Sequence, residues 1–266
     1  MALVLHANEG NKNAFKALIT AEYSGVQVEL VKNFQMGVSN KTPEFLRMNP
    51  MGKVPVLETP DGPVFESNAI ARYVARLKAD NPLYGSSLIE YALIEQWSDF
   101  SASEVDSNIA RWLYPRLGYV APYLPPAEEA AIAALKRALV ALNSHLSTNT
   151  YLVGHAVTLA DIIMTCNLYY GFGLIMTKNF TSEFPHVERY FWTMVNQPNF
   201  LKVVGETKQA ESLPSVPSSK KSAQPKEPVK PKVKEEAKKD TKREAVKLKP
   251  KVEAADEEVE APKPKP

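Results

Sequence analysis

The 266-residue chain contains a single cysteine, Cys166, which lies in an apolar run with helical spacing. One thiol cannot form a disulfide within its own chain, and the absence of disulfides is typical of proteins from a reducing compartment. Because its surroundings in the sequence are apolar, we interpret Cys166 as a buried bystander.

Metal-binding, membrane and export signals are also missing. The four histidines do not have the spacing of metal ligands, and there is no Cys-x-x-Cys pair. No apolar run approaches the ~20 residues of a membrane-spanning helix. The first residues lack the basic start and apolar stretch of a signal peptide. We therefore expect a cytoplasmic protein with no metal site and no membrane partner.

Aromatic residues are absent from the last sixty positions. Residues 207–266 contain sixteen Lys or Arg, eleven Asp or Glu and nine Pro, so they carry +5 while residues 1–206 carry −3. Such a segment buries too little apolar surface to offset the entropy of ordering, which predicts a disordered Lys/Glu/Pro-rich linker over 207–266. The interleaved charges favour a solvated linker over an RNA-binding tail, so no direct nucleic-acid binding is expected.

The first eighty residues alternate between strand and helix patterns. The period-two and period-3.6 spacings predict seven elements in the order β-α-β-α-β-β-α. These are expected at Leu3–Leu5, Asn13–Tyr23, Val26–Val31, Pro43 onward, Val54–Leu57, Val64–Phe65 and Ser67–Lys78. The order predicts an α/β thioredoxin-like domain over residues 1–80.

Residues 87–205 have helical spacing throughout and predict an all-α domain. One long helical segment is expected over Ser87–Tyr114, and a second begins at Pro125, where proline is favourable in the first turn. Thr158 and Asp161 have the spacing of a capping box, with Asp in place of the usual Glu. We interpret Asp161 as a structural cap rather than a catalytic carboxylate.

The most informative pattern combines Val54-Pro55 with Glu66-Ser67. Proline cannot donate to a sheet ladder, so Pro55 belongs at the start or edge of a strand, and its X-Pro bond can adopt the cis form. Ser67 precedes an apolar-periodic run and is expected to cap that helix. The start of the helix, with Glu66 beside it, then forms a small anion site. These parts suit a pocket that holds a peptide by its backbone and carboxylate.

In order and spacing, these motifs resemble the glutathione transferase family over roughly residues 3–204. The resemblance implies that family's fold, a thioredoxin-like domain followed by an all-helical domain. In the family, the residue before a cis-proline pairs with the cysteinyl backbone of glutathione, an acidic residue and a serine hold its γ-glutamyl end, and basic residues lie near its glycyl carboxylate. The glutathione-binding residues that the resemblance implies here are Lys41, Lys53, Val54, Pro55, Glu66 and Ser67. Glutathione is thus an expected ligand, and no cofactor is required.

The group that would activate glutathione is missing. The family stabilises the thiolate with a Tyr, Ser or Cys just after the first strand, because a hydrogen bond to the sulfur lowers its pKa. Residues 6–16 contain none of these side chains. Asn11 and Asn13 can donate amide hydrogen bonds and Lys12 can add positive charge, and all three are weaker candidates than a hydroxyl. This segment predicts binding with little or no chemistry.

Four segments further resemble the gamma-subunit family of eukaryotic translation elongation factor one, in its plant form. They are residues 13–19, 23–25, 42–47 and 64–71. That family joins a transferase-like region to a Lys/Glu/Pro-rich linker and a further C-terminal domain, which is absent here, so we expect a fragment of a longer chain.

The resemblance implies a non-catalytic scaffold that docks the nucleotide-exchange (beta-type) subunit, anchors the complex and acts indirectly on the aminoacyl-tRNA-delivering GTPase. A homodimer is a further hypothesis. The alternative is an active glutathione transferase that conjugates glutathione to electrophiles.

Overall fold

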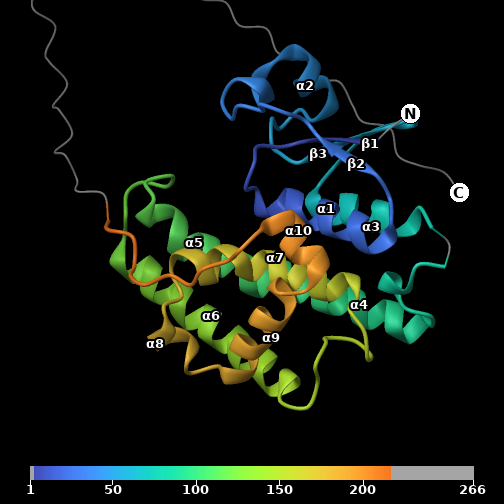
Figure 1. Cartoon of the computed structure of the whole chain (residues 1–266). Coiled ribbons are helices and arrows are strands. Elements are labelled where there is room, and N and C mark those ends of the chain that lie inside the picture. Colours follow the sequence, from blue (N-terminus) through green and yellow to red (C-terminus); the bar gives the residue numbers. More distant parts are fainter. Residues whose placement is uncertain (1–2, 79, 217–266) are drawn as a thin grey trace, which may run out of the picture. The chain divides into compact units, whose positions relative to one another are not determined.

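The computed structural model of the chain describes residues 3–78 and 80–216 (Figure 1). Its N-terminal part is built on a four-stranded mixed sheet with the strand order β2-β1-β3-β4. β1 is parallel to β2 and antiparallel to β3, and β3 is antiparallel to β4. The strands are β1 (Leu3–His6), β2 (Val28–Leu30), β3 (Val56–Thr59) and β4 (Gly62–Phe65).

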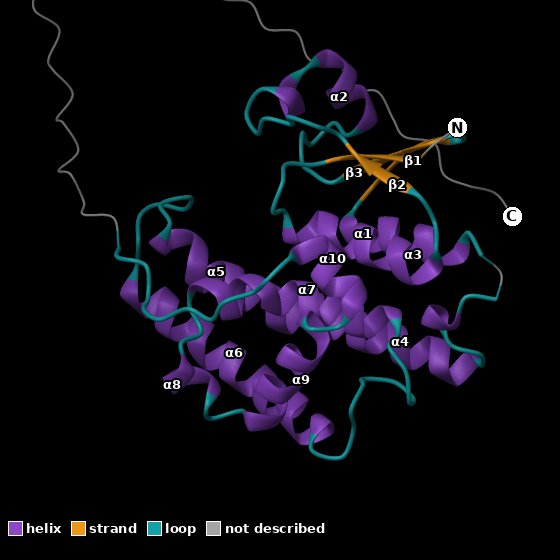
Figure 2. Ribbon diagram, in the orientation of Figure 1, coloured by secondary structure: helices purple, strands orange, loops and turns teal. Residues whose placement is uncertain are grey.

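Three helices complete this domain in the predicted β-α-β-α-β-β-α order. They are α1 (Lys12–Ser24), α2 (Pro43–Met48) and α3 (Ser67–Arg76). α1 and α3 lie together against one face of the sheet, and α2 lies on the other side (Figure 2). Small and branched side chains of α1 and α3, including Ala17 and Val74, form a core with Leu5 and Leu57 of the sheet. The predicted thioredoxin-like domain is therefore present.

Two of the predicted strands begin later in the structure than in the sequence analysis. β3 begins at Val56 rather than Val54, and β2 begins at Val28 rather than Val26. Pro55 explains the first difference, since it lacks the N–H group that a ladder position needs. The Val54-Pro55 bond is cis, and these two residues immediately precede the strand.

The second domain is helical. Its helices are α4 (Leu88–Phe100), α5 (Ser107–Arg116), α6 (Pro125–Leu146), α7 (Leu159–Leu174), α8 (Lys178–Thr181), α9 (Pro185–Val195) and α10 (Pro198–Val204). α7 lies at the centre, with Ile162, Met164 and Leu168 fully buried, and a helix that is apolar on most sides requires such a position. The predicted single helix over Ser87–Tyr114 is interrupted by a π-helical turn, Ser101–Asp106, between α4 and α5.

The predicted capping box is present at the start of α7. The backbone N–H and the hydroxyl of Thr158 both donate to Oδ2 of Asp161, each at 2.9 Å. The other carboxylate oxygen accepts from the N–H of Leu152 at 2.9 Å and from the hydroxyl of Tyr190 at 3.0 Å. Burial raises the pKa of Asp161 against the effect of these hydrogen bonds. Asp161 therefore joins three segments of the helical domain.

The predicted linker boundary at residue 207 is wrong for the ten residues that follow it. The N–H of Ala210 donates to the carbonyl of Phe172 at 2.8 Å, and the side-chain amide of Gln209 donates to the carbonyl of Met176 at 3.0 Å. Arg116 donates to the carbonyl of Pro214 at 2.9 Å. We call residues 207–216 the strap; it is the orange segment that runs past α7 in Figure 1. The rest of the predicted linker, 217–266, lies outside the described residues.

Two predicted absences can be compared with the described part of the chain. Within residues 3–78 and 80–216, no group of three or more His, Cys, Asp or Glu side chains is arranged to hold a metal ion. Over the same ranges, no helix combines the length and the apolar character needed to cross a membrane.

Candidate functional site

The turn that leads into β3 is held in place by two buried asparagines. The amide of Asn40 donates to the carbonyl of Gly52 at 2.7 Å, and the amide of Asn49 donates to the carbonyl of Lys53 at 2.9 Å. Gly52 has φ +61°, and a Cβ there would lie 3.1 Å from the carbonyl oxygen of Asn40, so the close approach requires glycine. These contacts fix the backbone of residues 52–54.

The start of α3 lies beside this turn. Val56 of β3 pairs with Phe65 of β4, so Pro55 and Glu66 continue from neighbouring strand ends. The residue at the N-cap position is Glu66, with φ +71°, and no side chain caps the helix. The prediction that Ser67 is the cap was therefore wrong by one residue. A non-glycine residue at positive φ costs roughly 1–3 kcal/mol, and such strain clusters at binding sites.

The hydroxyl of Ser67 faces a buried lysine. The ammonium of Lys16, on α1, donates to Oγ of Ser67 at 3.2 Å and to Oδ1 of Asn68 at 3.0 Å. Lys16 is only 3% exposed, and burial, with a smaller contribution from the nearby charge of Lys12, lowers the pKa of Lys16 to about 8. Its two hydrogen-bond partners are neutral, so the N-terminal end of α3 carries a buried positive charge.

Lys16 was not predicted as a site residue, although the sequence carries a signal for it. It lies between Phe15 and Ala17, which are both buried. A lysine within the apolar face of an amphipathic helix is seldom buried without a polar partner, and the partners here come from a helix fifty residues away in sequence.

The three weak catalytic candidates at the start of α1 have different surroundings. Asn11 is the N-cap of α1: its Oδ1 accepts from the N–H groups of Asn13 at 2.9 Å and Ala14 at 3.3 Å. The ammonium of Lys12 is buried and donates to Asp106 of the π-helical turn at 2.5 Å. The side chain of Asn13 is half-buried and makes no hydrogen bond within the described residues. Asn11 and Lys12 are thus engaged in holding the fold.

A pocket of about 540 Å³ opens beside these three residues. Its other walls come from α5, α7 and two loops, with Tyr114 and Tyr170 among the side chains that line it. The hydroxyl of Tyr170 donates to the carbonyl of Gly10 at 3.1 Å. Burial raises the pKa of both Tyr114 and Tyr170 further above neutral, and both phenols are available as hydrogen-bond donors. These hydroxyls belong to the helical domain, and sequence reasoning confined to residues 6–16 could not have found them.

The structure brings the residues predicted to bind glutathione to one end of the sheet. His6, the last residue of β1, pairs with Val56, so the segment before α1 lies beside the turn that contains Val54 and Pro55. Lys41 and Lys53 are exposed, and the ammonium of Lys41 lies 3.5 Å from where a Cβ of Gly52 would be. The arrangement offers a backbone edge, a helix N-terminus and three lysines to a small anionic peptide.

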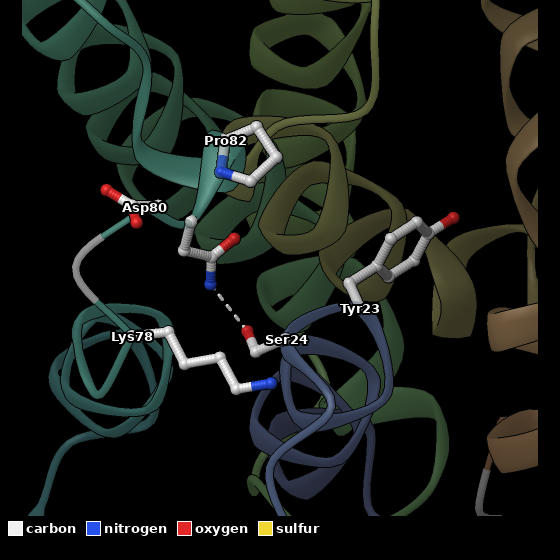
Figure 3. A pocket seen from close by; sticks show the side chains of 6 residues that line it. Tyr23, Ser24, Lys78, Asp80 and Pro82 are labelled. Atoms are coloured by element: carbon white, nitrogen blue, oxygen red, sulfur yellow. Dashed lines mark hydrogen bonds between the residues drawn. The ribbon is translucent and has the colours of Figure 1, made fainter.

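A separate cavity of about 370 Å³ lies at the other end of α1 (Figure 3). It is lined by Tyr23 and Ser24 of α1 and by residues that follow α3, among them Lys78 and Asp80. A hydrogen bond of 2.6 Å joins the amide of Asn81 to Oγ of Ser24 across it. None of the predicted site residues lines this cavity.

Comparison with known proteins identifies the class of protein. Residues 1–76 match the family model of the glutathione S-transferase N-terminal domain, and residues 114–198 match that of the C-terminal domain. A crystal structure of the glutathione transferase URE2P6 from Phanerochaete chrysosporium, in complex with oxidized glutathione, superposes with a TM-score of 0.67 at 28% identity, covering 76% of this chain and 94% of that one. The fold described above and these matches place the chain in the class of proteins with the glutathione transferase fold.

Within that class, the chain belongs to the elongation factor 1-gamma family. It is 81% identical over 227 residues to elongation factor 1-gamma 2 of Oryza sativa subsp. japonica, covering 85% of this chain and 54% of the relative. It is 71% identical over 266 residues to elongation factor 1-gamma of Prunus avium, and the match covers 100% of this chain and 62% of that relative. The chain therefore spans little more than half the length of these relatives.

A solved structure from the same family has the same fold. The glutathione transferase-like domain of elongation factor 1-gamma from Saccharomyces cerevisiae superposes with a TM-score of 0.70 at 23% identity, covering 81% of this chain and 99% of that domain.

Proposed function

We propose that the protein is a non-catalytic scaffold of the cytoplasmic elongation factor one complex. In this role it docks the nucleotide-exchange subunit and anchors the complex, and it acts on the aminoacyl-tRNA-delivering GTPase only indirectly. The proposal rests on the residues at the start of α1, where a transferase would hold the group that stabilises the thiolate. Asn11 caps the helix, Lys12 is paired with Asp106, and residues 6–16 contain no hydroxyl or thiol.

The chemistry of thiol activation explains why this observation matters. A thiol with a pKa near 8.5 is mostly protonated at neutral pH, and a transferase must stabilise its anion with a donor aimed at the sulfur. An ammonium already paired with a carboxylate contributes little further charge stabilisation. The amide oxygen of Asn11 accepts from the helix N-terminus, and its amide nitrogen donates to Oδ1 of Asn8 at 3.0 Å. Asn13 remains as a donor, and a neutral amide is a weaker stabiliser than a hydroxyl.

We propose that the predicted glutathione site, at the turn before β3 and the start of α3, still binds glutathione weakly. The backbone of residues 52–54, which Asn40 and Asn49 hold in place, the hydroxyl of Ser67 and the positive charge of Lys16 support this proposal. Binding without activation is consistent with a scaffold that keeps the ligand site of its fold.

The alternative function is conjugation of glutathione to electrophiles. The observation that favours it is the 540 Å³ pocket next to Asn13, with the protonated phenols of Tyr114 and Tyr170 in its walls. In a transferase, such a pocket would hold the electrophile.

One preparation of the full chain decides between the two functions. We expect it to form a stable complex with the purified exchange subunit of a plant elongation factor one in size-exclusion chromatography. In the same preparation, conjugation of chlorodinitrobenzene should stay near the uncatalysed rate. Turnover comparable to that of dedicated transferases, without a retained exchange subunit, would contradict the scaffold proposal. Light scattering of the free chain tests the proposed homodimer.

A further inference from the structure

The loop between α5 and α6 exposes several large apolar side chains. Leu117 is 39% exposed, Tyr119 76%, Val120 51% and Leu124 54%. Single exposed apolar residues are common, but four within eight residues form a patch of the kind that marks interaction sites. The loop follows α5 in Figure 1, where it is drawn in green.

This loop also forms a wall of two adjoining cavities. Val120 and Leu124 line a cavity of about 320 Å³ over α5 and α6, whereas Leu117 and Tyr119 line the 540 Å³ pocket. Tyr114 lines both, so the two hollows adjoin at this residue. We call the smaller cavity together with Tyr114 and residues 117–124 the loop groove.

The groove is held in shape by Arg116. Its guanidinium donates two hydrogen bonds to Glu128 of α6, at 2.7 and 2.5 Å, and one to the carbonyl of Pro214 in the strap, at 2.9 Å. Arg116 therefore ties the end of α5 to the start of α6 and to the strap. A groove fixed before binding loses less conformational entropy when a partner enters it.

The charge of the groove is positive at one point. Glu128 lines the smaller cavity, but its carboxylate is neutralised by Arg116. Arg111 lines the same cavity, is exposed, and makes no ion pair with any residue that the structure describes. The surface therefore offers apolar depressions with one available guanidinium at the rim.

We propose that the loop groove is the docking site for an amphipathic segment of the nucleotide-exchange subunit. The segment places aliphatic or aromatic side chains in the two hollows beside Tyr114, and an Asp or Glu next to them pairs with Arg111. Apolar anchors in a helix-in-groove arrangement provide affinity, and the charge pair fixes register and orientation. The inference rests on the proposed scaffold function and names the surface that would carry it out.

The test compares two double variants of the full chain with the same chemical changes. Arg111→Glu with Val120→Asp alters the groove. Arg137→Glu with Val140→Asp alters exposed residues of α6 that lie at least nine residues, or roughly 13 Å, beyond Glu128, the last residue of that helix to line the cavity. Calorimetric titration with the purified exchange subunit should show binding weakened by about tenfold or more for the groove variant, because apolar and charged anchors dominate interface energy. The α6 variant should bind like the unaltered chain.

Further measurements separate a docking defect from a folding defect. Both double variants change exposed positions, and their melting temperatures should match that of the unaltered chain. Tyr119→Ser provides a milder groove variant, and Arg111→Lys, which keeps the charge, should retain most of the affinity. If both double variants bind like the unaltered chain, or both weaken equally, the groove assignment is overturned while the scaffold function stands. If the unaltered chain itself does not bind the exchange subunit, the scaffold function fails, and the groove assignment with it.

Discussion

At the scale of single residues, the charge on Lys16 links the candidate site to the stability of the fold. An unfolded lysine titrates near 10.5, whereas burial lowers the pKa of Lys16 to about 8. Below pH 8 the folded and unfolded chains are both protonated at this position, and the cost of burying the ammonium is fully present. Between pH 8 and 10.5 the unfolded chain binds more protons, so the free energy of unfolding rises with pH.

The corresponding variant is Lys16→Met, which removes the titrating group. The free energy of unfolding of the unaltered chain, minus that of the variant, should rise by roughly 2–4 kcal/mol between pH 8 and pH 10.5. Urea unfolding of both proteins at several pH values measures this difference, and the titration of other groups cancels in it. A difference that stays constant across the range would show that Lys16 is solvated or ion-paired.

Ser67 offers a second test at the residue scale. Ser67→Ala removes a hydroxyl that would hydrogen-bond the γ-glutamyl carboxylate, so glutathione affinity should fall by about tenfold. Calorimetry of the full chain with millimolar glutathione is the measurement, and Ser86→Ala, in the loop before α4, serves as a control at a remote serine. If the unaltered chain gives no heat of binding, the site that contains Ser67 does not bind glutathione.

Asp161 is the residue whose loss should cost most. Asp161→Ala leaves the N–H groups of Leu152 and Thr158 and the hydroxyl of Tyr190 without their acceptor. Buried donors without partners are expensive, and the free energy of unfolding should fall by roughly 2–5 kcal/mol, as measured by thermal or urea unfolding. Molecules that still fold should bind the exchange subunit normally. An unchanged melting temperature would contradict the capping role.

At the scale of elements, the strap is the feature with the clearest consequence for stability. A chain ending at residue 206 lacks the hydrogen bonds of Gln209 and Ala210 to the α7–α8 region and that of Arg116 to Pro214. Its free energy of unfolding should fall by roughly 1–3 kcal/mol relative to a chain ending at residue 216. Differential scanning calorimetry of the two chains checks this expectation. Equal melting temperatures would mean that the strap contributes nothing to the fold.

The elements also show how far sequence reasoning reaches. Periodicity, proline and cap residues depend on neighbours a few positions away, so the order of the elements in the first eighty residues and the capping box at Thr158 were predicted correctly. The π-helical turn Ser101–Asp106 and the strap depend on contacts with distant segments, such as the ion pair of Asp106 with Lys12. Composition averaged over sixty residues also hid the few strap residues that pack.

The candidate site shows the same difference between local patterns and long-range contacts. The Val54-Pro55 and Glu66-Ser67 motifs are local, and the antiparallel β3–β4 hairpin brings them together. Lys16 and the two tyrosines reach the site from α1, α5 and α7, and no local pattern predicts that meeting. Asn11 was interpreted as a weak thiol activator, although an asparagine just before a helix is a common N-cap.

At the scale of the whole molecule, α1 and α3 each contribute to two separate cores. Ala17 and Val74 pack in the core of the sheet, whereas Phe15, Ile19 and Ala75 belong to the core that includes α7. A sheet domain separated from the helices would expose these three side chains to water and would lose their burial energy. Although two family models divide the chain, the described residues should melt as a single cooperative unit.

This cooperativity is measurable because the reporters are divided between the two halves. All three tryptophans, Trp97, Trp112 and Trp192, belong to the helical half, so their fluorescence reports on that half alone. Amide exchange in β1 and β3 reports on the other half, and both signals should give the same free energy of opening. If the strands exchange at a much lower free energy than the fluorescence transition, the two halves are independent. With cooperative unfolding, a substitution in the buried seam between α1 and α7 would lower the abundance of the entire protein in the cell, even at positions far from any binding surface.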